Sequence, residues 1–128
     1  MTDTKFPRLT AGSDARRAAC DVMVEIIRGW AAEGQAHSYS TLSALMKESG
    51  YSVPHRGPLM SALLEEACRA EAGRGVPVML TAIVVNKHSR RPSGQFEVLA
   101  KEEPFRRGDL PNWTWKAEKD RVFDHYRQ

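Results

Sequence analysis

Hydrophobic residues recur at helical spacing in the first part of the chain. After Ser13 and Asp14, apolar side chains fall three or four positions apart as far as Trp30, and Gly34 follows. This spacing puts them on one stripe of a helix. Serine accepts hydrogen bonds from the first free N–H groups of a helix, and glycine often adopts the left-handed conformation that ends one. The pattern predicts a helix between Ser13 and Gly34.

Two more helices are predicted in the middle of the chain. Apolar positions in residues 39–50 favour a short helix capped by Ser40. Pro58 suits the first turn of the next helix, where its missing N–H costs nothing, and that helix would end at Gly73 or Gly75. Between them, residues 51–57 form a loop.

After the third helix the pattern becomes β-like. Val78–Val85 is apolar except for Thr81 and rich in β-branched residues, which predicts a largely buried strand. Residues 86–94 contain proline and glycine and predict a turn. Gln95–Ala100 alternates between polar and apolar residues like a returning strand.

The last part of the chain is polar and then helical. Residues 101–112 indicate a linker, with Asn112 as the expected cap of a final helix. One face of that helix would carry Trp115, Val122, Phe123 and Tyr126.

This order of elements predicts an α+β domain of the winged helix-turn-helix type. Three helices would be followed by a two-stranded hairpin wing and a C-terminal helix. Residues 1–12 would be a flexible arm, and residues 13–128 a single winged-helix-like domain with a C-terminal helical extension. The alternative is a small α+β domain whose helices do not meet at the winged-helix angle.

Composition fits one globular domain. The chain has 128 residues, of which 41% are hydrophobic and 27% charged. It has no apolar run of 18 residues and no apolar segment typical of a secretory signal, so we expect no membrane span and a cytoplasmic location. Cys20 and Cys68 have no metal-site or redox spacing and are expected to be buried thiols, although a disulfide stays open.

Positive charge is unevenly distributed. The formal net charge is +3 and the pI about 9.1. Residues 49–64 contain no acid and hold His55 and Arg56. Residues 72–96 also contain no acid, and their basic residues include Lys87, His88, Arg90 and Arg91. Two acid-free windows on one face would attract a polyanion.

Three short segments resemble a known family of DNA-binding domains. They are Ser38-Tyr39-Ser40-Thr41-Leu42, Arg56-Gly57, and Val76-Pro77-Val78-Met79-Leu80. Together they resemble the DNA-binding domain of O6-alkylguanine DNA alkyltransferases and alkyltransferase-like proteins, over roughly residues 37–96. The resemblance implies a partner of duplex DNA and a phosphate contact for Tyr39.

The acceptor chemistry of that family is not expected here. Its Pro-Cys-His-Arg site would fall where this chain has Val84-Val85-Asn86-Lys87. Alkyl transfer needs a nucleophilic thiolate, and no cysteine lies nearby. The resemblance therefore favours a non-catalytic, alkyltransferase-like DNA reader, in a setting such as a regulator or a phage- or defence-related protein.

The predicted nucleic-acid contacts come from the two acid-free windows and the helix starts. Arg56 would enter a groove or stack, and cations beyond Val85 would neutralise phosphates. Because Glu65 and Glu66 occupy the body of the third helix, backbone and shape contacts would dominate base readout. The full set of expected contacts is Tyr39, Ser52, His55, Arg56, Ser61, Lys87, His88, Arg90 and Arg91.

We predict no catalytic residues, no metal and no cofactor. The four histidines lie in separate elements without zinc-site spacing, and no phosphate-binding or dinucleotide motif occurs. An alternative function is a protein–protein interaction module, such as an inhibitor or adaptor, that uses the aromatic C-terminal helix. The sequence does not decide the oligomeric state.

Overall fold

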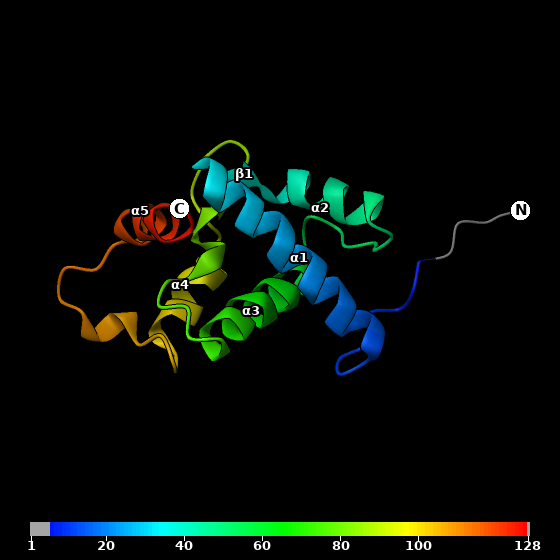
Figure 1. The fold of residues 1–128 in the computed structure, drawn as a ribbon, viewed down its shortest axis with the longest axis horizontal. Coiled ribbons are helices and arrows are strands. Elements are labelled where there is room, and N and C mark those ends of the chain that lie inside the picture. Colours follow the sequence, from blue (N-terminus) through cyan, green and yellow to red (C-terminus); the bar gives the residue numbers. More distant parts are fainter. Residues whose placement is uncertain (1–5, 128) are drawn as a thin grey trace, which may run out of the picture.

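The protein, described by a computed structural model over residues 6–127, is mainly helical (Figure 1). The predicted flexible arm lies partly outside the described residues. Within residues 6–127, each helix is too short or too polar to cross a bilayer. In chain order the elements are α1 (Asp14–Glu33), β1 (His37–Ser38), α2 (Tyr39–Glu48), α3 (Pro58–Gly73), the 3₁₀ turn η1 (Leu80–Ile83), β2 (Val84–Val85), α4 (Gly94–Lys101), the 3₁₀ turn η2 (Arg107–Asp109) and α5 (Trp115–Tyr126).

Helix α1 confirms the first prediction at both ends. The Ser13 hydroxyl accepts a hydrogen bond from the Arg16 N–H at 3.1 Å. Gly34 has a φ of 73°, and its N–H donates to the carbonyl of Ala31. A side chain at this φ would be strained, which explains why the helix ends at a glycine.

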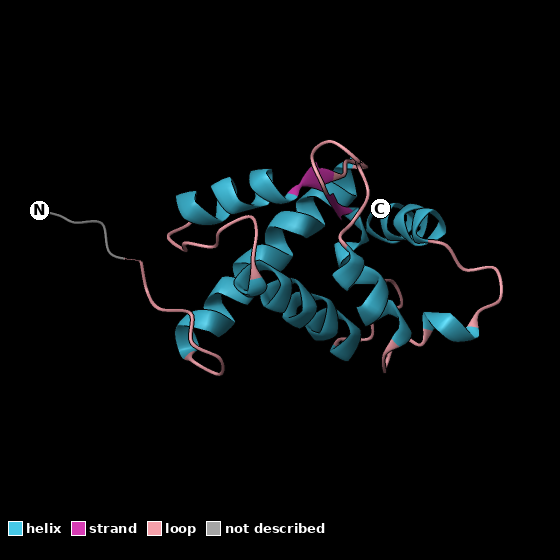
Figure 2. Cartoon of the chain, turned by 180° about the vertical axis from the view of Figure 1, so that it is seen from behind, coloured by secondary structure: helices cyan, strands magenta, loops and turns pink. Residues whose placement is uncertain are grey.

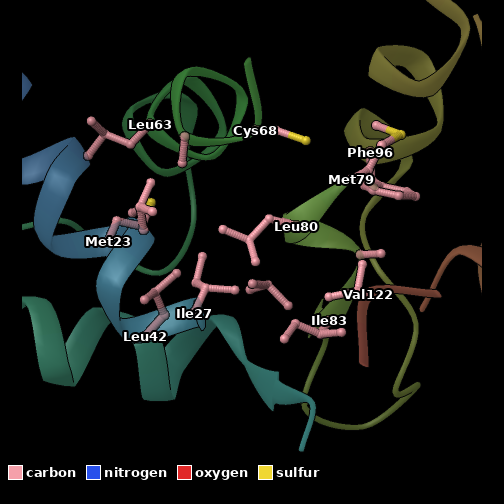
Figure 3. Packing of buried hydrophobic residues seen from close by; sticks show 14 of the residues in the cluster. Met23, Ile27, Leu42, Leu63, Cys68, Met79, Leu80, Ile83, Phe96 and Val122 are labelled. Carbon is pink, nitrogen blue, oxygen red and sulfur yellow. The ribbon is translucent and has the colours of Figure 1, made fainter. Parts of the chain in front are cut away.

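The core is built around α1, which packs against α2, α3, α5 and η1. Figure 3 shows side chains from these elements pointing toward one another. Such close packing excludes water from the centre of the molecule and is the main stabilising term. Fully buried members of the cluster are Met23, Ile27, Leu42, Leu63, Leu80, Ile83 and Val122.

The predicted returning strand, Gln95–Ala100, is wrong because this segment is helix α4. A segment of only six residues can fit both the two-residue repeat of a strand and the 3.6-residue repeat of a helix. Phe96, Leu99 and Ala100 are buried, which is the i, i+3, i+4 spacing of a helix, whereas Val98 is 53% exposed. A strand would require Val98 on the buried face.

The predicted long strand, Val78–Val85, is also wrong. Only Val84–Val85 is a strand, and η1 precedes it. With α4 helical, no returning strand pairs with this segment. Buried backbone groups of this segment form hydrogen bonds with side chains of the C-terminal region instead. The N–H of Met79 donates to Glu118 at 2.8 Å, and the carbonyl of Ala82 accepts from the Trp115 indole at 2.7 Å.

The sheet is a two-stranded parallel pair and not a hairpin. His37 pairs with Val84, and Ser38 with Val85. The winged helix-turn-helix class is therefore overturned: the described chain has five α-helices and this short sheet, without a β-hairpin wing. Figure 2 shows that a loop, rather than a strand, joins β2 to α4.

Two predicted caps and the linker are corrected as well. Ser38, not Ser40, caps α2, because its hydroxyl accepts from the Thr41 N–H at 3.1 Å. Thr114, not Asn112, caps α5. The stretch 101–112 contains η2 and the buried side chain of Phe105, so it is packed structure.

Glu118 is a fully buried carboxylate that joins α5 to the rest of the core. Arg107 donates to both of its oxygens, at 2.8 and 3.0 Å. The Trp113 indole donates at 2.7 Å, the Met79 N–H at 2.8 Å and Arg121 at 3.3 Å. A buried charge is tolerated only when such partners surround it.

Glu71 of α3 is a second fully buried carboxylate. Arg28 of α1 donates to both oxygens, at 2.8 and 2.7 Å, and Arg74 donates at 3.0 Å. The Tyr126 hydroxyl donates at 2.5 Å. This carboxylate therefore ties α1, α3 and the end of α5 together.

The pKa values of both carboxyls lie below the ordinary value of 4.5. Burial alone would raise each pKa, but the hydrogen bonds outweigh it. At Glu71 the donors are chiefly Arg28 and Tyr126, and at Glu118 chiefly Arg107 and Trp113. Both groups therefore stay ionised in the folded protein at neutral pH.

Replacing Glu118 by glutamine is expected to destabilise the fold and to change its acid sensitivity. Because the folded pKa is below the unfolded one, the ionised carboxylate stabilises the protein above about pH 4.5, and this contribution is lost as the pH falls further. Glu118→Gln should lower the unfolding free energy by about 3 kcal/mol at about pH 7. The unfolding free energy of the variant should also fall less steeply than that of the wild type as the pH is lowered below about 4.5. Urea unfolding at neutral and acidic pH measures this.

The matched control is Asp120→Asn, which removes an exposed carboxylate from the same helix. It should shift the unfolding free energy by less than about 0.5 kcal/mol. Equal losses of stability for both variants would contradict a specific role for the buried carboxylate.

Both cysteines are buried free thiols, which confirms that prediction and not the disulfide. Burial, aided at Cys20 by the nearby Glu66, raises the pKa of each thiol to about 11.

The thiolate is the reactive form of cysteine, so Ellman's reagent at about pH 8 should modify the native protein far more slowly than the urea-unfolded protein. Equal rates in the two states would contradict this burial.

Candidate nucleic-acid interface

Tyr39 stands at the first position of α2, where β1 passes directly into the helix. Its hydroxyl accepts a hydrogen bond from the N–H of Ser93 at 2.8 Å. Ser93 precedes the first residue of α4, so this bond joins the starts of two helices. The bond uses an oxygen lone pair, and the phenolic proton can still be donated to an acceptor.

The loop of residues 51–57 presents His55 and Arg56 just before α3. Val53 anchors this loop in the core, and its carbonyl accepts from the Ser43 hydroxyl at 2.5 Å. Gly57 has a φ of 109°, which favours glycine, and Pro58 then begins the helix. The two basic side chains are exposed as a result.

A second loop, residues 86–93, turns the chain from β2 to α4. The Asn86 N–H donates to the carbonyl of Arg91 at 2.8 Å, and the Arg90 N–H donates to the carbonyl of Asn86 at 3.0 Å. The Asn86 side chain adds a third bond to Arg91 at 3.0 Å. These bonds close the loop on itself and leave Lys87 and His88 exposed at its tip.

The two loops and the start of α2 border one groove, which we call the basic groove. Its volume is about 560 Å³. No carboxylate is among its lining residues, which are Tyr39, Ser40, His55, Arg56, Asn86, Lys87, His88 and Ser89. An adjoining cavity of about 200 Å³ extends it toward Ser61 and Ser93. Figure 2 shows the two loops beside each other on the face seen there.

The structure thus brings together five of the predicted contacts in the basic groove: Tyr39, His55, Arg56, Lys87 and His88. Ser61 lines the adjoining cavity. The groove also includes Asn86, Ser40 and Ser89, which sequence reasoning missed. The signal for Asn86 and Ser89 was their position within the same acid-free window as Lys87.

Three predicted contacts line neither the basic groove nor the adjoining cavity. Arg90 donates to the carbonyl of Ala36 at 3.0 Å and thereby ties the loop to the segment before β1. The Arg91 guanidinium lies 5.3 Å from the ring centre of Trp115. Ser52 is exposed in the loop of residues 51–57 and is not among the groove's lining residues.

The groove is chemically suited to an anion. Arg56 and Lys87 have no ion-pair partner among the residues that the structure describes, so their charges are not neutralised internally. Hydroxyl and amide groups from Tyr39, Ser40 and Asn86 add hydrogen-bond donors. Within residues 6–127, no cluster of three or more histidine, cysteine or acidic side chains could hold a metal ion.

The acids of α3 have partners of their own. Glu65 pairs with Arg69 at 2.9 Å, and Glu66 pairs with Arg16 at 2.5 Å. Glu65 lines a neighbouring surface pocket with Ser61 and Gln95, and Ser61 also lines the cavity that adjoins the basic groove. These ion pairs reduce the repulsion that α3 exerts on an anion, and they also occupy Arg69, an arginine in the body of the helix that could otherwise contact a base.

The aromatic residues of the C-terminal region belong to the core. Trp113, Trp115, Phe123 and Tyr126 all pack against the central cluster. The two indoles donate to Glu118 and to the Ala82 carbonyl, and the Tyr126 hydroxyl donates to Glu71. Their polar groups are therefore used inside the protein.

Comparison of the chain with protein-family models, with curated proteins and with solved structures gave no match. The resemblance to alkyltransferase domains rests on the short segments in residues 37–96 alone and stays a prediction.

Proposed function

We propose that this protein binds duplex DNA, without catalysis, through the basic groove. The observation that carries the proposal is that Arg56, from the loop before α3, and Lys87, from the loop after β2, line the same groove. Cations gathered from separate parts of the chain, without acids between them, are the electrostatic pattern of a polyanion site.

The protein would bind mainly the DNA backbone. Arg56 and Lys87 would each neutralise a phosphate, and His88 would add a hydrogen-bond donor. Tyr39 would donate its phenolic proton to a phosphate oxygen while Ser93 holds the ring in place. Helix α3 would touch DNA only with its first turn, because Glu65 and Glu66 follow. Recognition would therefore depend on backbone and shape more than on base sequence.

A non-catalytic role agrees with the chemistry of the groove. Neither cysteine lines it, and burial keeps both thiols protonated at neutral pH, since it raises the pKa of each. Among the described residues, no hydrogen bond pairs a groove serine with His55 or His88 as a base would require. We place the protein in the cytoplasm, where thiols stay reduced.

The protein–protein alternative receives less support. It relied on an aromatic helix face free to dock, whereas Trp115 and Tyr126 pack against the core. Among residues 6–127, the exposed large apolar side chains are Val98 of α4 and Leu110, which follows η2, so they form no shared helix face.

The proposal predicts salt-dependent DNA binding that depends on the groove. Fluorescence anisotropy with a labelled duplex of about 20 base pairs, at several ionic strengths, measures the slope of log affinity against log salt. The variant Arg56→Ala/Lys87→Ala should bind more weakly. Its slope should be shallower by about 0.9 for each phosphate that is no longer neutralised.

The matched control is Arg17→Ala/Lys47→Ala, which removes the same charge elsewhere. Arg17 is on the first turn of α1, and Lys47 is on the last turn of α2, away from Tyr39. This control should bind nearly like the wild type. Similar losses of affinity for both double variants, or no duplex binding at low salt, would refute the proposal.

A further inference from the structure

Two positively charged side chains lie beside the ring of Trp115, on the side of loop 86–93 that faces away from the basic groove. The Arg91 guanidinium lies 5.3 Å from the ring centre, and the Lys119 ammonium lies 5.2 Å from it. Neither cation has an ion-pair partner among residues 6–127. Two positive charges beside one indole raise the local positive potential, which attracts a polyanion.

The site is held in place by the fold. The Trp115 indole donates to the carbonyl of Ala82 at 2.7 Å, which fixes the ring against η1. Lys119 is four residues further along α5 and therefore lies on the same helix face. The loop bonds of Asn86 and the bond from Arg90 to Ala36 fix the backbone that carries Arg91.

The acids on either side of Lys119, Glu118 and the exposed Asp120, form no ion pair with Arg91 or Lys119 within residues 6–127. Glu118 precedes Lys119, but its carboxylate is buried and bonded to Arg107. No acidic residue occurs in loop 86–93. The surface around Trp115 thus keeps the charge of both cations.

The position of the pair relative to the basic groove suggests its use. Figure 2 shows loop 86–93 between the loop of residues 51–57 and α5. Lys87 and His88 line the groove on one side of loop 86–93, and Arg91 reaches Trp115 on the other. One loop therefore has cations on both flanks.

We infer that Arg91 and Lys119, held on Trp115, bind the backbone of the second strand when a duplex occupies the basic groove. This inference rests on the proposed function and extends it to an assignment of strands. Arg56 and Lys87 bind the backbone of one DNA strand, and Arg91 and Lys119 bind the backbone of the other. Loop 86–93 then lies in the groove of the DNA, between the two strands. The partner is then double-stranded nucleic acid, because a single strand reaches only one flank.

The test compares duplex and single-stranded probes of equal length with the full chain. Arg91→Gln/Lys119→Gln should weaken duplex binding and make its salt slope shallower by about 0.9 for each phosphate released. It should leave the affinity for the single strand within about twofold of the wild type. Arg56→Ala/Lys87→Ala should weaken binding to both probes.

Control variants separate charge from packing. Arg91→Lys/Lys119→Arg keeps both charges and should bind duplex like the wild type. Lys47→Gln/Lys101→Gln removes two exposed charges from the ends of α2 and α4 and should have little effect. Thermal unfolding should change little in the Arg91 and Lys119 variants, because a cation–aromatic contact at the protein surface stabilises a fold only weakly.

The results distinguish this inference from the proposed function. If Arg91→Gln/Lys119→Gln weakens binding to both probes equally, or to neither, the strand assignment is wrong while groove binding stands. If the wild type binds neither probe, both proposals fail. Inorganic phosphate should compete no better than chloride at the same ionic strength. Specific competition by phosphate would assign the Trp115 pair to a free anion and overturn its role in duplex binding.

Discussion

The ionised side chain of Glu118 determines where the chain runs after α3. Its two oxygens accept hydrogen bonds from the backbone of Met79, from Arg107 and from the Trp113 indole. These bonds hold the segment before β2 against α5, although no neighbouring strand supports it there. Since β2 leads directly into loop 86–93, the position of one wall of the basic groove depends on a carboxylate buried on the other side of η1.

Glu71 has the corresponding role for the helices. It binds Arg28 of α1, Arg74 and the hydroxyl of Tyr126, so it connects the longest helix to the last one. Neither carboxylate could be assigned to the interior from sequence. Glutamate is rarely buried, and its burial depends on arginines that are distant along the chain.

Local signals predicted the parts of the fold that local physics controls. Ser13 and Gly34 cap the two ends of α1, and Pro58 begins α3. These signals are readable from sequence because a cap or a proline acts within one turn of the helix. Short apolar segments were ambiguous. Residues 95–100 fit a strand and a helix equally well, and tertiary burial of Phe96 and Leu99 decided for the helix.

The candidate site was predictable to a similar extent. The two acid-free windows indicated a shared face, and Arg56 and Lys87 do line one groove. The different surroundings of Arg90 and Arg91 were not predictable, because they depend on the carbonyl of Ala36 and the ring of Trp115. Nothing in the local sequence separates a cation that faces a groove from one that holds a loop.

The short parallel pairing of β1 with β2 has a consequence for the order of folding. It joins His37 to Val84 and thereby closes a long stretch of chain with very few backbone bonds. Loop-closure entropy makes such a pairing unfavourable until the intervening helices have docked. We therefore expect the basic groove to be among the last features to assemble during folding, after the helical core that supports it.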